Sequence, residues 1–176
     1  MKILVASTPA TGHVNPMLAI ARILMIEGHE VAIYTGSAFR ARVENAGAKF
    51  FSLPPEADID LTDPFARIPE LKVLPPGPDW LRVAMERFFV DNIPAQQEGL
   101  QRLLHEFGPD VIVGDDCFFG VLPMLLGARS KRPPIVQCGT SILHWPREDG
   151  APPYLGLPPA TTPKQRAEYA ALARDF

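Results

Sequence analysis

The chain has 176 residues and a formal net charge of −3, with two cysteines. This length suits one good-sized domain, and the slightly acidic balance lacks the basic footprint of a nucleic-acid-binding protein. Two cysteines are too few for a disulfide framework or a cysteine-based metal site, so we expect a cytoplasmic protein without a metal. We expect neither a signal peptide nor a membrane span, because no apolar run has the required form or length.

Apolar runs and helical spacing alternate from the N-terminus onward. Ile3–Ala6 predicts a buried strand, and residues 17–24 predict a helix after it. We expect Asn15 to be the N-cap of that helix, Pro16 its first residue and Gly28 its C-terminal stop. The other predicted elements are strands over 30–35, 49–53, 110–114 and 134–139, and helices over 37–47, 80–107 (kinked or split by Pro94), 119–128 and 163–176.

This alternation predicts an α/β fold, a Rossmann-like parallel sheet of order 3-2-1-4-5 with helices on both faces. Two proline-rich segments, 54–79 and 145–163, interrupt it, and we interpret both as loops. A short helical piece is expected near 68–71. Segment 54–79 is unusually long for a loop, which is typical of functional loops, so we expect it to be a mobile gate over a binding site.

Phosphate-binding motifs are missing. The sequence has neither a G-x-x-x-x-G-K-[ST] loop nor a G-x-G-x-x-G turn, and the turn after the first strand carries only Gly12. This pattern argues against a dinucleotide-dependent dehydrogenase.

His13 is the most informative residue, because it follows the first strand at the edge of the sheet where α/β proteins bind ligands. We expect it on the turn, just outside the helix. A lone histidine in such a turn is most often solvated or capping. Here, however, Thr8-Pro9-Ala10-Thr11-Gly12-His13-Val14-Asn15-Pro16-Met17-Leu18 resembles the N-terminal signature of inverting glycosyltransferases of the UDP-glycosyltransferase and macrolide glycosyltransferase type.

The resemblance implies a GT-B architecture, in which two Rossmann-like domains face a cleft, with residues 1–176 forming the acceptor-binding first domain. It also implies that His13 is the general base that deprotonates the acceptor hydroxyl. An acidic partner follows the fourth strand in that family, and Asp115 matches its position best, with Asp116 as the second candidate. We expect one carboxylate to orient His13 and the other to cap the next helix.

Further candidates come from the same edge of the sheet. Thr140 and Ser141 resemble a small polar turn of the family's cleft, and segment 152–159 resembles a loop beside the acceptor pocket. Phe118 and Phe119 follow Asp115 and are better placed for an acceptor than Phe88, which has core spacing. The expected substrate-binding residues are Thr11, Gly12, Asn15, Phe88, Asp116, Phe118, Phe119, Thr140, Ser141 and Trp145.

In the resembling family a C-terminal domain holds the nucleotide sugar, and nothing here matches that domain. We therefore expect no bound cofactor, a UDP- or dTDP-sugar held mainly by a separate C-terminal donor domain, and a hydrophobic hydroxyl-bearing acceptor. One alternative is a non-catalytic subunit or scaffold domain that docks a catalytic half. Another is a nucleotide-sugar epimerase of similar build, which would need no acceptor.

Overall fold

The computed structural model describes residues 1–59, 64–141, 145–153 and 155–174. Its centre is a parallel sheet with the order β3-β2-β1-β4-β5, which confirms the predicted topology. The strands are β1 (Lys2–Ala6), β2 (Glu30–Thr35), β3 (Lys49–Ser52), β4 (Val111–Asp115) and β5 (Ile135–Cys138). Since β1 lies between β2 and β4, with Ala6 opposite Gly114, the chain leaves β1 beside Asp115, the last residue of β4.

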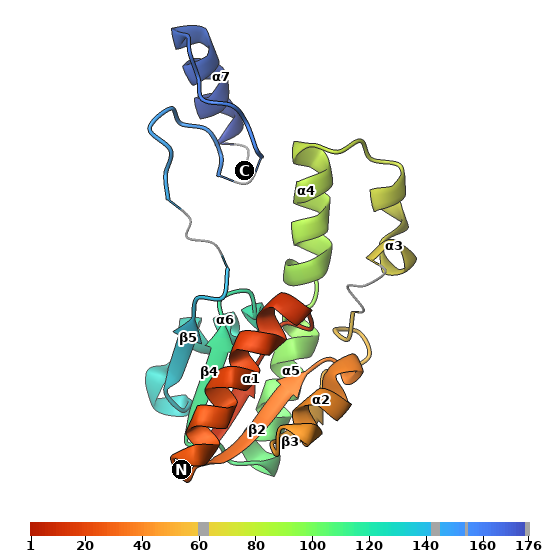
Figure 1. Cartoon of the computed structure of the whole chain (residues 1–176), viewed down its shortest axis with the longest axis vertical. Helices are drawn as coiled ribbons and strands as arrows, with labels where there is room; N and C mark the ends of the chain where they lie inside the picture. The colour runs from red at the N-terminus through yellow and green to blue at the C-terminus, as the bar shows by residue number, and fades with distance from the viewer. Residues whose placement is uncertain (60–63, 142–144, 154, 175–176) are drawn as a thin grey trace.

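Helices and short helical turns connect these strands (Figure 1). The helices are α1 (Thr11–Ile26), α2 (Arg40–Asn45), α3 (Pro64–Arg67), α4 (Pro78–Met85), α5 (Ile93–Glu106), α6 (Leu122–Leu126) and α7 (Pro163–Leu172). The 3₁₀ turns are Ser37–Phe39, Pro69–Lys72, Phe119–Val121 and Arg129–Lys131, and Glu86–Val90 is a π-helical turn. Among the described residues, every helix is too short or too polar to cross a bilayer.

Side chains alternate between the two faces of the sheet and build a separate core on each. Ile3 and Val5 pack with Met17 of α1, whereas Leu4 and Ala6 pack with Leu100 of α5. Accordingly, Figure 1 shows α1 in front of the sheet and α5 behind it. Both faces of the central strands are thereby removed from water, which is typical of parallel sheets.

The start of α1 differs from the prediction. The helix begins at Thr11, after an extended Ala10, so that Asn15 is not the N-cap and Pro16 lies inside the helix. Pro16 deprives the Gly12 carbonyl of a helical partner, but Gly12 is exposed, so water can satisfy that carbonyl. His13 therefore lies in the first turn of α1 and not outside it. The predicted end is correct, because Gly28 has a positive φ of 84° directly after the C-cap.

Segment 54–79 carries more structure than a loop. It contains α3 and the 3₁₀ turn Pro69–Lys72, which confirms the short helical piece, and Ile68 and Leu71 are buried against Ala84 of α4. The indole N–H of Trp80 donates to the carbonyl of Leu71 at 3.1 Å. These contacts join the segment to α4, and both project beyond the carboxyl edge of the sheet (Figure 1).

The predicted helix over 80–107 is split, as Pro94 requires. The π-helical turn separates α4 from α5, and Pro94 takes an early position in α5, where its missing N–H has no helical partner to lose. The predicted helix over 119–128 is a 3₁₀ turn followed by the shorter α6. Parts of three predicted segments, 60–63, 154 and 175–176, lie outside the described residues.

Segment 145–163 is organised around one ion pair. The guanidinium of Arg147 binds the Asp149 carboxylate at 2.7 Å, and that carboxylate also accepts the backbone N–H groups of Ala151 and Ala160. Segment 163–172 then forms α7, which begins with a capping box between Thr162 and Gln165. This C-terminal part also lies beyond the carboxyl edge in Figure 1.

Candidate functional site

His13 and Asp115 meet where β1 and β4 end. The Nδ1 atom of His13 lies 3.2 Å from Oδ1 of Asp115, which brings together the two residues singled out by the sequence. The His13 side chain is 19% exposed and that of Asp115 is fully buried, so the imidazole alone of the pair reaches solvent. None of the described residues hydrogen-bonds to Nε2 of His13.

Asp115 is held from three directions. Its carboxylate accepts the backbone N–H of Thr8 at 2.6 Å, the hydroxyl of Thr8 at 3.1 Å and the backbone N–H of Cys117 at 2.9 Å. A buried charge needs such partners to offset its lost hydration. Asp115 is thereby fixed as an acceptor beside His13.

Asp116 does not cap the following helix, contrary to the prediction. Its Oδ1 accepts the backbone N–H of Thr140 at 3.1 Å and the Thr140 hydroxyl at 2.8 Å, and its Oδ2 accepts the Ser141 N–H at 3.3 Å. The reason is the sheet order: β5 lies beside β4, so the turn after β5 presents its N–H groups to the carboxylate. The hydroxyl of Thr140 in turn lies 2.9 Å from Nδ1 of His13.

These contacts shift the acidities of both residues. The hydrogen bond to Asp115 raises the pKa of His13 above 6.5; partial burial opposes this, and the charges of Asp115 and Asp116 reinforce it. Burial alone would raise the pKa of Asp116, but hydrogen bonds from Thr140 and Ser141 outweigh it and hold this pKa at about 2. Asp116 is therefore charged at neutral pH.

Most of the other predicted substrate-binding residues are exposed or half-buried, and two pack into hydrophobic clusters. Thr11 and Gly12 are exposed at the start of α1, and the exposed Asn15 accepts a hydrogen bond from Arg42 of the neighbouring segment at 2.9 Å. Trp145 is 74% exposed, and Phe119 lies 5.8 Å from Phe89, centroid to centroid. Thr11, Gly12, Asn15 and Trp145 are thus accessible to solvent.

Phe118 and Phe88 are the exceptions. Phe118 is fully buried and packs edge-to-face on Tyr34, so it is a core residue here and not a wall of the site. The backbone turns directly after β4, which sends Phe118 into the core beneath α5 and leaves Phe119 half-buried. Phe88 packs against the cluster of Ile68, Leu71 and Ala84.

Thr8 and Cys117 belong to the site although the sequence reasoning assigned neither a role. Both bind Asp115 through backbone N–H groups, which no residue type reveals. The available signal was positional: each lies within two residues of a strand end at the same edge. The thiol of Cys117 is 3.4 Å from the Ser141 hydroxyl.

The fold also gathers four groups of metal-ligand type. Ligand atoms of His13, Asp115, Asp116 and Cys117 lie within 4.8 Å of one another, and the sequence analysis did not expect Cys117 among them. Hydrogen bonds already occupy the oxygens of both carboxylates that face this group. Burial, chiefly, raises the pKa of the Cys117 thiol, so it keeps the proton that a metal would have to displace.

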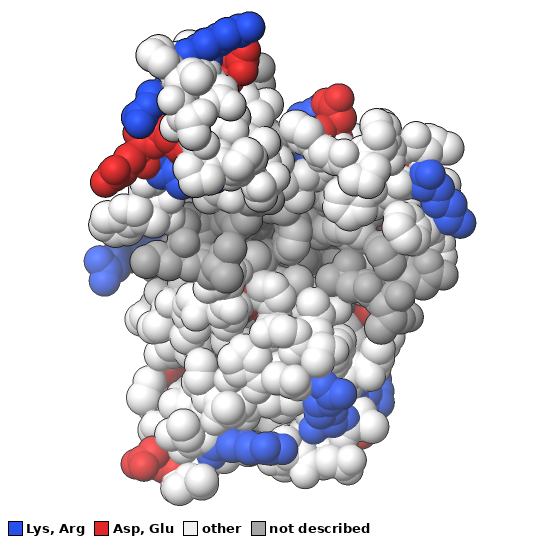
Figure 2. Space-filling model, turned by 45° about the horizontal axis from the view of Figure 1, so that its top comes forward, with Lys and Arg blue, Asp and Glu red and all other residues white. Residues whose placement is uncertain are grey.

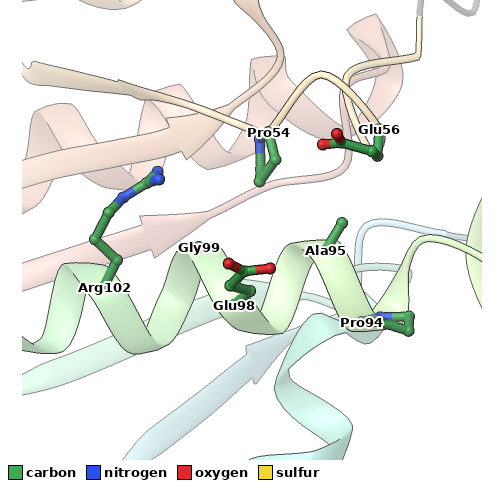
Figure 3. A pocket seen from close by; sticks show the side chains of 7 residues that line it. All are labelled: Pro54, Glu56, Pro94, Ala95, Glu98, Gly99 and Arg102. Carbon is green, nitrogen blue, oxygen red and sulfur yellow. The ribbon is translucent and has the colours of Figure 1, made fainter.

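A separate pocket of about 430 Å³ lies between α5 and the segment after β3. Figure 3 shows Pro54 and Glu56 facing the helix, from which Ala95 and Arg102 rise toward them. Its remaining lining residues are Pro94, Glu98 and Gly99. None of these residues takes part in the His13 network.

The carboxyl edge can be seen in Figure 2, which brings the upper end of the molecule forward. Charged side chains lie mainly along the outline of this view, and few appear in its middle. The described surface in the middle of this view is therefore largely uncharged.

Comparison with known proteins places this geometry in context. Residues 3–136 match the model of the glycosyltransferase family 28 N-terminal domain. The sheet and its helices correspond to the N-terminal portion of GT-B glycosyltransferases of known structure. A calicheamicin glycosyltransferase, for example, is 26% identical with a TM-score of 0.57, over 77% of this chain and 31% of that protein.

Two curated relatives are closer in sequence. The chain is 35% identical to 4'-demethylrebeccamycin synthase of Lentzea aerocolonigenes over 92% of its own length and 37% of that protein. It is 34% identical to UDP-glycosyltransferase 2 of Phaeomoniella chlamydospora over 96% of its own length and 38% of that protein. The chain thus spans less than two fifths of the length of either relative.

Proposed function

Because this chain belongs to the glycosyltransferase family 28 N-terminal domains, we propose that it is the acceptor-binding half of an inverting glycosyltransferase. The observation that carries the proposal is the pairing of His13 with the buried Asp115 at the carboxyl edge of the sheet. This arrangement leaves one nitrogen of the partly exposed imidazole, Nε2, without a hydrogen-bond partner among the described residues.

His13 would act as the general base. Its Nε2 takes the proton of the acceptor hydroxyl while the hydroxyl oxygen forms a bond to the anomeric carbon of the donor sugar. The bond between that carbon and the phosphate oxygen breaks, and the nucleoside diphosphate leaves with the electron pair. Asp115 stabilises the imidazolium that forms, as a buried carboxylate does for the histidine of a catalytic triad.

The acceptor would be a hydrophobic compound that carries a hydroxyl group. Phe119, Phe89 and the exposed Trp145 offer aromatic surface. One curated relative is named 4'-demethylrebeccamycin synthase, and the other is named a UDP-glycosyltransferase. Sites for such ligands are typically apolar with a few polar groups that fix orientation.

The donor would be a UDP- or dTDP-sugar held mainly by a C-terminal domain, which the family description implies as the partner of this one. The sequence contains neither of the two glycine-rich phosphate-binding motifs. We also propose that segment 54–79 gates the acceptor site, since it projects with α4 beyond the carboxyl edge.

The test is a transfer assay on a fusion of this chain to the C-terminal half of 4'-demethylrebeccamycin synthase. With nucleotide sugars and a panel of hydrophobic hydroxyl compounds, we expect transfer by the fusion and none by the 176-residue chain alone. His13→Ala should reduce turnover by about 10²–10⁴-fold, the usual share of general-base catalysis.

The control is His105→Ala, which removes an exposed histidine in the last turn of α5 that takes no part in the His13 network, and it should leave turnover unchanged. Near-normal turnover of the His13→Ala fusion would remove the general-base role. Turnover of the nucleotide sugar without any acceptor would instead indicate an epimerase, and a fusion that binds its donor but never transfers would favour a docking role.

A further inference from the structure

We propose that Thr140 is a positioning residue for His13: with Asp116 behind it, its hydroxyl fixes the imidazole so that Nδ1 carries the proton and Nε2 is free. This inference rests on the proposed function only for its catalytic meaning. Its geometry comes from four contacts that join the ends of β1, β4 and β5.

The hydroxyl of Thr140 has one proton, and its direction is decided by Asp116. Oδ1 of Asp116 lies 2.8 Å from the Thr140 Oγ1 and can only accept, because this carboxylate is ionised at neutral pH. The hydroxyl therefore donates to Asp116. It is left with lone pairs for His13, whose Nδ1 lies 2.9 Å away.

Two acceptors thus face the same nitrogen of His13. Oδ1 of Asp115 lies 3.2 Å from Nδ1, and Oγ1 of Thr140 lies closer, at 2.9 Å. If Nδ1 carried no proton, its lone pair would face the lone pairs of both oxygens and repel them. A proton on Nδ1 satisfies both, and a neutral imidazole with a proton there carries its free lone pair on Nε2.

Asp115 alone would hold the ring less firmly. Three donors converge on its Oδ1, namely the Thr8 hydroxyl, the Cys117 N–H and His13 itself. An oxygen with two lone pairs cannot serve three donors equally well. The shorter contact to Thr140 supplies a second acceptor, so the N–H of Nδ1 is held between two oxygens and not by one alone.

The experiment measures the tautomer and the titration of His13 by nitrogen-15 NMR on the 176-residue chain, with His13→Gln to assign its signals. We expect the neutral wild-type imidazole to carry its proton on Nδ1. Thr140→Val keeps the N–H bond to Asp116 and the shape of the side chain but removes the hydroxyl. It should move population to the Nε2–H tautomer and lower the pKa of His13.

Two variants and a control sharpen the result. Thr140→Ser retains the hydroxyl and should restore the wild-type tautomer. Asp116→Asn removes the charge behind Thr140 and should lower the pKa of His13, in the same direction as Thr140→Val. Thr35→Val is the matched control, because the buried Thr35 hydroxyl has no hydrogen-bond partner in the described chain, and it should change neither quantity.

In the fusion protein, Thr140→Val should lower kcat about fivefold, the effect of one net hydrogen bond, with KM for the donor unchanged. The inference is overturned if the wild-type proton lies on Nε2, or if Thr140→Val leaves tautomer and titration as they were. If Thr140→Val does not fold, the other two variants test the inference: Asp116→Asn should lower the pKa of His13, and Thr140→Ser should keep the wild-type tautomer. Failure of the general-base role would show separately, as undiminished transfer by His13→Ala.

Discussion

At the scale of single residues, His13 makes the site sensitive to pH in a defined direction. Its pKa is raised in the folded chain, first by the Asp115 hydrogen bond, so protonated His13 stabilises the fold. That stabilisation is fully present below pH 6.5, the ordinary value, and disappears as the pH rises through the raised value. The transfer rate should change oppositely, because the base must be unprotonated to act.

Urea unfolding of the wild-type chain and of His13→Gln between pH 5.5 and pH 8.5 measures the stability effect. We expect the free energy of unfolding of the wild type to exceed that of the variant most at the acidic end, with the difference shrinking as the pH rises. A constant difference across the range would mean that the proton on His13 contributes nothing to folding. Turnover of the fusion should rise with pH over the same interval.

The sequence predicted those contacts that follow from the order of the strands, and it missed those that depend on the local course of a turn. The pairing of His13 with Asp115 was predictable, because both follow strands that a 3-2-1-4-5 order makes neighbours. Asp116 was assigned to a helix cap since acidic residues often cap helices, and the sequence does not reveal that the turn after β5 reaches it first. Phe118 was predicted at the site because it follows Asp115 closely. The sequence does not show which of two successive side chains after a strand points into the core, and here Phe118 does.

At the scale of elements, the distance between α5 and the sheet is set by Gly99. A Cβ at this position would collide with the Oη and Cζ atoms of Tyr34, a fully buried residue of β2. Gly99→Ala should gain up to about 1 kcal/mol of helix propensity but lose about 1–3 kcal/mol to overpacking, so the net effect is destabilising.

Denaturant unfolding of Gly99→Ala, of Tyr34→Phe and of the double variant tests this account. Tyr34→Phe removes the nearest clashing atom, so the cost of Gly99→Ala should be smaller in its background. Equal costs in both backgrounds would show that the helix adjusts elsewhere. Strict additivity is the behaviour of distant residues, and these two are in contact.

The elements themselves were predictable to different degrees. The strands were predicted correctly, since a short apolar run bounded by turn residues is typical of a buried strand in a parallel sheet. The predicted start of α1 was wrong: Asn15 and Pro16 are good start signals, but the helix begins five residues earlier, after the extended Ala10. The π-helical turn before α5 has no sequence signal beyond Pro94.

At the scale of the whole molecule, the topology followed from alternation alone, whereas the arrangement of the projecting parts did not. The segments that contain α4 and α7 both extend past the carboxyl edge, and each has a small core of its own. Proline-rich stretches predicted loops there, because proline disfavours the interiors of strands and helices. Proline is tolerated at the first position of a helix, however, and both α4 and α7 begin with one. The donor half of the proposed enzyme lies outside what this sequence can specify.

The carboxylates of Asp115 and Asp116 also join segments that lie far apart in the sequence. Thr8, Cys117 and Thr140 give their amide hydrogens to side-chain oxygens, and Thr8 lies 107 residues from its acceptor. These hydrogens belong to no strand ladder, yet they should exchange slowly with deuterium, because releasing them means separating strand ends. Asp116→Asn should accelerate deuterium exchange at Thr140 and leave Thr8 protected, whereas equal acceleration at both would mean that the ends of β1, β4 and β5 open as one.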